Sequence, residues 1–186
     1  MAERVCPWWL GYWLASPIRK WISEDPEKLL APYVRAGMTV LEPGPGMGYF
    51  TLPMGRMVGT AGRVVAVDLQ PKMLAELERR ARKSGLGDRI EVRQAEPSRL
   101  LIDDLKDRVD FALAFAVVHE MPSAEAFFAE TAAALKPGAM LFFAEPSGHV
   151  NAGKFQAELD AARKAGLEVA GEPEVRGSHA AVLRKR

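Results

Sequence analysis

The sequence predicts an α/β protein of three layers, in which a mostly parallel, doubly wound sheet of seven strands lies between helices. Strand and helix patterns alternate from residue 38 onward. Several of the strands are uninterrupted apolar runs, which suit a parallel sheet that is covered on both faces. The last two strands are joined by a short segment around Gly171-Glu172-Pro173, which permits an antiparallel C-terminal hairpin.

The first part of the alternation predicts three strands and two helices. We expect the strands over residues 38–41, 64–68 and 89–93 and the helices over residues 49–58 and 71–85. Pro53 is tolerated because the first turn of a helix has N–H groups without intrahelical partners. Pro71 begins the second helix, Gly85 ends it, and Glu78 and Arg82 form an i,i+4 pair on it.

The second part predicts four more strands and three helices. We expect the strands over residues 109–116, 139–144, 167–170 and 180–183 and the helices over residues 97–105, 124–135 and 152–165. Ser123 is the expected N-cap of the helix that follows it, and Pro137-Gly138 is expected to end that helix. Gly166 is the expected stop of the last helix.

A glycine turn follows the first predicted strand. The strand ends at the acidic Glu42, and Gly44, Gly46 and Gly48 follow at every second position. Such a turn lets a ligand lie against bare backbone at the C-terminal end of a parallel strand. A dinucleotide fingerprint reads Gly-x-Gly-x-x-Gly, and here the third glycine arrives one residue earlier. The order resembles motif I of class I methyltransferases, which bind S-adenosylmethionine.

Further segments extend this resemblance along the chain. Residues 90–96 resemble motif III of the family, with Gln94 where an aspartate usually stands, and a glutamine carbonyl still accepts a hydrogen bond. Residues 110–122 resemble motif IV, and residues 135–141 resemble a Leu-Lys-Pro-Gly-Gly segment of the family. The resemblance is nearest to the small-molecule group that includes quinone-biosynthesis methyltransferases. It implies a Rossmann-like core over residues 38–186 in a single domain of residues 1–186.

The resemblance implies a site for S-adenosylmethionine at the ends of the strands. Glu42 faces the ammonium of the ligand, Asp68 accepts from both ribose hydroxyls, and Leu69 and Met73 flank the adenine. The full set of expected cofactor-binding residues is Glu42, Pro43, Gly44, Pro45, Gly46, Gly48, Asp68, Leu69, Met73, Gln94, Ala95, Phe115 and Ala116. A simpler interpretation treats the glycines as a turn and Asp68 as a solvated acid.

Methyl transfer by in-line displacement needs a positioned nucleophile and, where that nucleophile must lose a proton, a general base. His119 and Glu120 follow the fourth strand, and His119 is the better candidate because its reference pKa is near neutrality. A purely structural role for His119 remains an alternative. Glu145 and His149 follow the fifth strand and are candidates to line the acceptor pocket or to be simple loop residues.

Residues 1–33 are expected to form a helical lid segment rich in tryptophan. Tyr12 and Trp13 are candidates to shape the acceptor site. The alternatives are packing against the core helices and contact with a membrane surface.

Composition narrows the class of protein. The 186 residues carry a net charge of +1, which argues against a nucleic-acid partner. The single Cys6 and the dispersed histidines, His119, His149 and His179, predict no disulfide and no metal site. No apolar run approaches the ~20 residues that span a bilayer, and no signal peptide is recognisable, so we expect a cytoplasmic protein.

The sequence therefore predicts an S-adenosylmethionine-dependent methyltransferase that acts on an unidentified small molecule. Two other hypotheses stay open at this point. One is an NAD-type nucleotide-binding oxidoreductase, which shares the strand, turn and helix. The other is a non-catalytic S-adenosylmethionine-binding regulatory domain, because no residue is decisive for catalysis.

Overall fold

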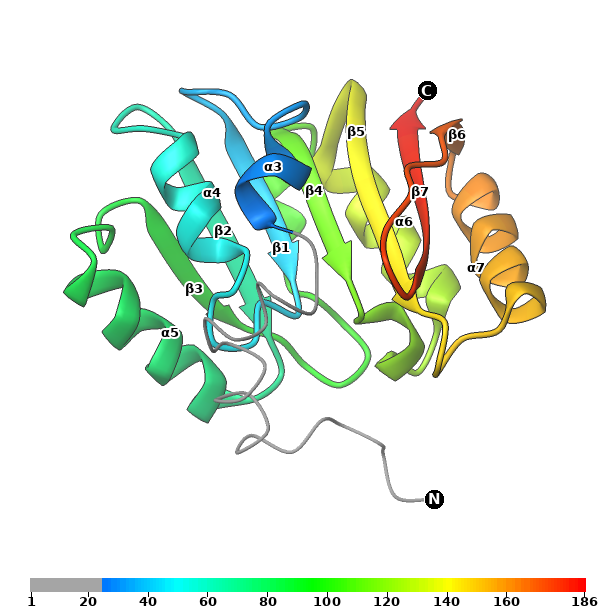
Figure 1. Cartoon of the computed structure of the whole chain (residues 1–186), viewed down its shortest axis with the longest axis horizontal. Coiled ribbons are helices and arrows are strands. Elements are labelled where there is room, and N and C mark those ends of the chain that lie inside the picture. The colour runs from blue at the N-terminus through cyan, green and yellow to red at the C-terminus, as the bar shows by residue number, and fades with distance from the viewer. Residues whose placement is uncertain (1–24) are drawn as a thin grey trace. The chain divides into compact units, whose positions relative to one another are not determined.

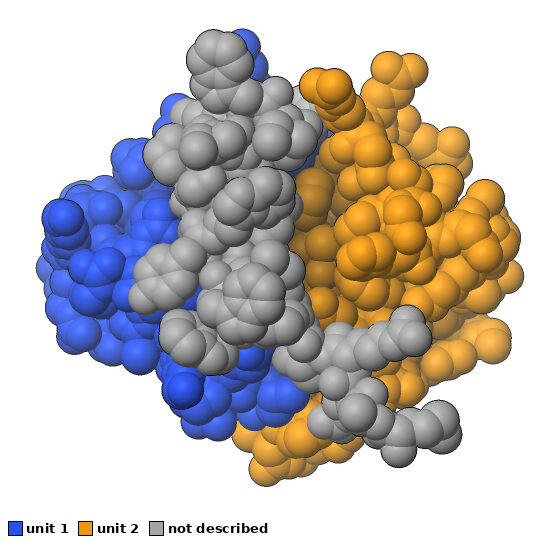
Figure 2. All heavy atoms as spheres, turned by 60° about the horizontal axis from the view of Figure 1, so that its bottom comes forward, with its two compact units in different colours: residues 1–95 blue, residues 96–186 orange. Residues whose placement is uncertain are grey.

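The computed structural model describes residues 25–186 (Figure 1), and the chain divides into two compact units, residues 1–95 and 96–186 (Figure 2). The strand order is β3-β2-β1-β4-β5-β7-β6 in a seven-stranded sheet. This order, with mostly parallel pairs and an antiparallel C-terminal end, confirms the predicted fold class. A single domain over residues 1–186 stays a prediction, and the tryptophan-rich segment up to residue 24 lies outside the described residues.

The first unit holds three parallel strands and the helices that cover them. Its elements are α3 (Pro26–Leu30), β1 (Thr39–Pro43), α4 (Thr51–Met57), β2 (Arg63–Asp68), α5 (Pro71–Lys83) and β3 (Ile90–Gln94). β1 and β3 both pair with β2 in parallel. The apolar face of α5 buries Leu74, Leu77 and Ala81, and α5 contacts both β2 and β3. Glu78 and Arg82 form the expected pair at 3.2 Å.

The second unit holds four strands. Its elements are η1 (Asp103–Leu105), β4 (Val109–Phe115), η2 (Val118–Glu120), α6 (Ala124–Ala134), β5 (Leu135–Pro146), α7 (Ala152–Lys164), β6 (Leu167–Gly171) and β7 (Ser178–Lys185). β4 and β5 are parallel, whereas β7 runs antiparallel to both β5 and β6, which confirms the expected hairpin. Ser123 caps α6, because its Oγ accepts from the Ala126 N–H at 3.1 Å.

Two expectations about the second unit were wrong. The chain forms no helix over residues 97–105, only the short η1 at the end of that range. The Leu100 N–H donates to Glu130 Oε2 at 3.0 Å rather than to a helical carbonyl, and Leu101 has a positive φ of 57°. Pro137-Gly138 also does not separate α6 from the next strand, because β5 begins directly at Leu135.

Among the helices of residues 25–186, none has the length and apolar character that crossing a bilayer requires.

Candidate functional site

The three glycines of the turn after β1 have different physical roles. Gly44, Gly46 and Gly48 all have positive φ angles, of 70°, 53° and 92°. A Cβ on Gly46 would meet no atom within 4 Å, so this position faces open space. A Cβ on Gly48 would lie 2.6 Å from Leu77 Cδ1, so this glycine lets the turn pack against α5. The turn therefore offers bare backbone at Gly46 and close packing at Gly48.

Glu42 lies at the C-terminal end of β1 and is only 3% exposed. It accepts a hydrogen bond from Thr51 Oγ1 at 2.6 Å. Burial raises the pKa of Glu42 to about 8, against the lowering effect of the Thr51 hydrogen bond, and the charge of Asp68 raises it further. Glu42 is therefore largely protonated at neutral pH in the unliganded protein.

Asp68 ends β2 and is tied to the glycine turn. Its carboxylate accepts from the Gln70 N–H at 2.9 Å and also from the backbone of Gly46 and Leu69. Burial raises the pKa of Asp68, and these backbone hydrogen bonds oppose that effect. The Ala95 N–H donates to the Asp68 carbonyl at 3.0 Å, so the end of β3 is held beside the end of β2.

The remaining cofactor candidates of the first unit lie around this group. Pro43, Pro45, Met73 and Ala95 are buried, Leu69 is half-buried, and Gln94 is exposed while its backbone pairs with Asp68. The first unit thus brings together the candidates that the sequence predicted on β1, β2 and β3. Sequence reasoning missed Thr51 and Arg80, whose Nη1 donates to the Met47 carbonyl at 2.5 Å and fixes the turn from α5.

In the second unit, the backbone after β4 is strained. Phe115 ends the strand, and Ala116 follows with a positive φ of 58°, a conformation that alanine rarely adopts. The Ala116 N–H donates to the Ala144 carbonyl on β5 at 2.8 Å, which holds this conformation. With this backbone conformation at Ala116 the chain leaves β4 and continues into η2, which carries His119 and Glu120.

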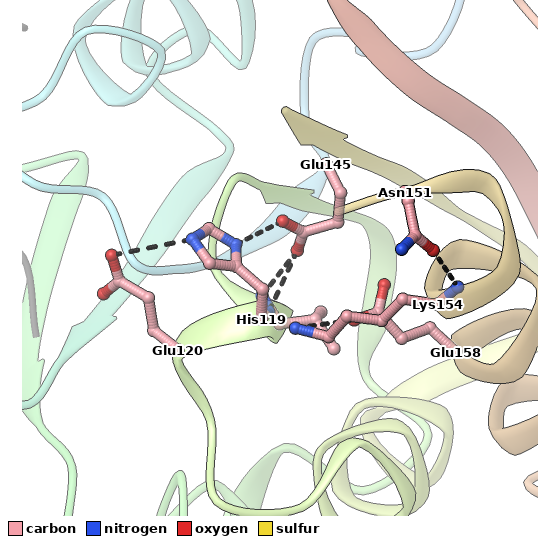
Figure 3. A network of polar contacts seen from close by, with 7 residues as sticks. His119, Glu120, Glu145, Asn151, Lys154 and Glu158 are labelled. Carbon is pink, nitrogen blue, oxygen red and sulfur yellow. Dashed lines mark hydrogen bonds and ion pairs between the residues drawn. The ribbon is translucent and has the colours of Figure 1, made fainter. Parts of the chain in front are cut away.

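His119 and Glu145 form a hydrogen-bonded pair (Figure 3). Glu145 is near the end of β5 and is 0% exposed. Its Oε1 accepts from the Val118 and His119 backbone N–H groups at 2.7 and 3.3 Å, and its Oε2 contacts His119 Nδ1. The Glu145 hydrogen bond raises the pKa of His119, against the lowering effect of partial burial.

Other polar groups surround this pair. Glu120 Oε1 lies 4.0 Å from His119 Nε2, and the His149 ring meets the His119 ring edge-on at a centroid distance of 5.4 Å. Glu158, on α7, has Oε1 at 3.9 Å from Lys154 Nζ. Burial raises the pKa of Glu158 to about 7, and the Glu145 charge adds to this rise. Within residues 25–186, no His, Cys, Asp and Glu side chains form a group that could hold a metal ion.

The second unit thus brings together four predicted residues, His119, Glu120, Glu145 and His149. Glu145 was expected either to line a pocket or to lie in a loop, and the loop alternative was wrong, because Glu145 lies in β5 and its carboxyl group bonds to η2 and to His119. Its place in an acceptor pocket stays a prediction. Sequence reasoning also missed Glu158, because nothing in the sequence of α7 distinguishes this residue from the other residues of the helix. Tyr12 and Trp13 lie outside the described residues.

Comparison with known proteins gives a family and similar structures. A family model described as a methyltransferase domain matches residues 40–138, more than half of the chain. The ribosomal protein L11 methyltransferase of Pelotomaculum thermopropionicum is 33% identical over 114 residues, which are 61% of this chain and 34% of that protein. The ubiquinone/menaquinone biosynthesis C-methyltransferase UbiE of Hahella chejuensis is 34% identical over 119 residues, 63% of this chain and 47% of that protein. The chain thus spans less than half of the length of these two relatives.

A solved structure extends the similarity over nearly the whole chain. The crystal structure of a SAM-dependent methyltransferase from Aquifex aeolicus matches 98% of this chain and 100% of its own, with a TM-score of 0.86 and 26% identity. These comparisons confirm the predicted family and the predicted cofactor, S-adenosylmethionine, and UbiE supports the likeness to the quinone-biosynthesis group. The chain belongs to the methyltransferase domain family and has the fold of S-adenosylmethionine-dependent methyltransferases.

Proposed function

We propose that this protein transfers the methyl group of S-adenosylmethionine to a small-molecule acceptor. The observation that carries the proposal is the cluster in the first unit, where buried Glu42, Asp68 and the open backbone at Gly46 lie at the ends of adjacent strands. The family favours this function over an NAD-type oxidoreductase.

The residues present fit the parts of S-adenosylmethionine. Its ammonium suits the carboxyl group of Glu42, its ribose diol suits the carboxylate of Asp68, and the unfilled space at Gly46 allows close approach to the backbone. Buried Met73 and half-buried Leu69 provide apolar surface for an adenine. When bound, the ligand supplies a methyl group on a sulfonium, an already activated leaving group, so the protein needs no covalent residue.

His119 is the proposed general base of this reaction, with Glu120 as a second candidate. The His119 side chain is 13% exposed and is thus not fully closed off by the protein. The remaining candidates of the second unit, Phe115, Ala116 and His149, belong to the same segment or contact its ring. The acceptor is proposed to be small because the net charge of +1 provides no excess of basic residues for nucleic acid.

Titration calorimetry with S-adenosylmethionine and its demethylated product tests the cofactor. We expect both to bind, and no binding of either at millimolar ligand would refute the proposal. A radiolabelled methyl group then tests the acceptor, by incubating the protein with labelled donor and a cell extract. We expect label that resists both ribonuclease and protease and passes a small-pore filter. Label retained on RNA or on protein would instead indicate a macromolecular acceptor.

A further inference from the structure

We infer that Glu145 is a positioning residue that makes Nε2 of His119 the proton-accepting atom of the reaction. This inference rests on the proposed function, and it deepens it by stating what the acceptor must provide. The acceptor that suits this centre has a nucleophile that must lose a proton, such as the hydroxyl group of a phenol or an enol.

The hydrogen bonds of Glu145 determine the orientation and tautomer of the ring. Its Oε1 is occupied by two backbone donors of η2, so its Oε2 is left for His119 Nδ1. A carboxylate has no proton to donate, and the proton of this contact therefore belongs to the ring nitrogen. A neutral imidazole with a proton on Nδ1 has its lone pair on Nε2.

The same carboxylate also fixes where Nε2 is held. Glu145 binds both the backbone of η2 and the ring of His119, so a turn of the ring would break its contact with Oε2 (Figure 3). Among residues 25–186, the carboxylate oxygen nearest to Nε2 is Glu120 Oε1, and its distance of 4.0 Å is beyond hydrogen-bond range. Nε2 is thus oriented by contacts made at the opposite side of the ring.

The proton transfer balances with this arrangement. The acceptor O–H bond breaks and its proton moves to Nε2, while the electrons of the nucleophile form a bond to the methyl carbon. The sulfur–carbon bond breaks, and its electron pair stays on sulfur as a neutral thioether. The imidazolium that forms is paired with the buried Glu145 carboxylate until its proton returns to water.

Charged groups on three elements face His119 and influence its pKa. They are Glu120 on η2, Glu145 on β5, and Lys154 on α7, while Glu158 on α7 couples to both His119 and Glu145. The carboxylates favour the imidazolium and the lysine opposes it. The direct hydrogen bond of Glu145 has the largest effect, so removal of this one group is expected to change the titration most.

Nitrogen-15 NMR of the full protein tests the inference without any acceptor. The three histidine rings, His119, His149 and His179, are assigned by single His→Gln variants. At high pH we expect His119 to carry its proton on Nδ1, and we expect its titration midpoint to lie above 6.5. In Glu145→Gln we expect the midpoint to fall and the Nε2–H tautomer to appear, because an amide can donate to Nδ1. Glu168→Gln, an exposed change on β6, is the matched control and should leave the midpoint and the tautomer of His119 unchanged.

The outcomes separate this inference from the proposed function. An Nε2–H tautomer in the wild-type protein, or a midpoint that Glu145→Gln leaves in place, would overturn the inference, and calorimetry would still report cofactor binding. The wild-type measurement decides even if Glu145→Gln does not fold. With the acceptor found by label transfer, His119→Ala and Glu145→Gln should each lower kcat about 100-fold or more, with the cofactor Kd unchanged. Failure of the wild-type protein to bind S-adenosylmethionine would refute the proposed function instead.

Discussion

The two units each bury a glutamate near the C-terminal end of a parallel strand, and the two glutamates differ in their hydrogen-bond partners. Glu42, in the first unit, has a hydrogen bond from one hydroxyl group, and burial raises its pKa to about 8. Glu145, in the second unit, is met by two backbone N–H groups and by a histidine ring. The first carboxyl group is buried with little support from the protein, whereas the second is held by hydrogen bonds from its own unit.

This difference indicates two kinds of function. A buried carboxyl group with few hydrogen bonds from the protein is poorly stabilised in its ionised form. A ligand that carries positive charge therefore stabilises that form strongly. A buried carboxylate whose partners are internal serves mainly to hold those partners in place. We therefore expect changes in the first cluster to alter cofactor affinity, and changes in the second to alter the behaviour of His119.

The largest expected effect is on Gly46, because the open space beside this glycine is the proposed position of the ligand. In Gly46→Val the side chain enters the open space beside the turn, and we expect the Kd for S-adenosylmethionine to rise about 100-fold or more. Calorimetry measures this change. The matched control is Gly138→Val in the second unit, at a glycine that also has a positive φ and open space. Both variants carry backbone strain, and equal loss of affinity in both would remove the distinction between the units.

The next effect concerns the ribose contact of Asp68. In Asp68→Ala the two hydroxyl groups lose a charged acceptor, and we expect the Kd to rise about 10-fold or more. The backbone of Gly46 also loses its contact with the carboxylate, so a loss of affinity could come from the ribose or from the turn. Asp68→Asn separates these two causes, because its amide keeps an acceptor oxygen without the charge. The exposed Asp160→Asn on α7 is the control in the second unit. An unchanged Kd in Asp68→Ala would contradict the proposed position of the ribose.

The proton on Glu42 should appear in the pH dependence of cofactor binding. The pKa of Glu42 is about 8 without ligand, and a cationic ligand favours the ionised form. Binding therefore releases a proton below pH 8, and affinity should rise with pH by up to about tenfold per unit until that value. Calorimetry in buffers of different ionisation enthalpy measures the released proton. Glu42→Gln should abolish this Glu42-dependent release, and an identical pH dependence in that variant would contradict the role of Glu42.

The fold was largely predictable because hydrophobic pattern and turn residues determine it. Apolar runs such as Val64–Val67, the proline that begins α5 and the serine that caps α6 each act through local chemistry. The helix expected over residues 97–105 failed because a distant side chain, Glu130, takes the Leu100 N–H. The start of β5 was missed because Leu135 already pairs with Val109 of β4, and Pro137-Gly138 lie in an irregularity before the pairing resumes at Met140.

The candidate site was predictable in part. The residue types and positions of Glu42, Gly46 and Asp68 are enough to indicate the cofactor. The sequence also named both His119 and Glu145, but it did not pair them, because 26 residues separate them and the contact depends on two strand ends. Thr51 and Glu158 carry no sequence signal, since their roles come from burial beside other polar groups.

The last expected effect is on stability, and it has opposite signs for the two glutamates. Native Glu42 binds its proton more tightly than the unfolded chain, whose reference pKa is 4.5, so its contribution to stability falls as pH rises from 4.5 to about 8. Relative to the wild-type protein, Glu42→Gln should therefore gain stability across this window, with a limiting slope of about 1.4 kcal/mol per pH unit. Glu145→Gln should instead lose about 1–3 kcal/mol, because the backbone of η2 and the His119 ring lose a charged acceptor. Urea unfolding at pH 5 and pH 8 measures both differences. If both variants lost stability alike as pH rose, Glu42 would be as well supported as Glu145, and the contrast between the two units would fail.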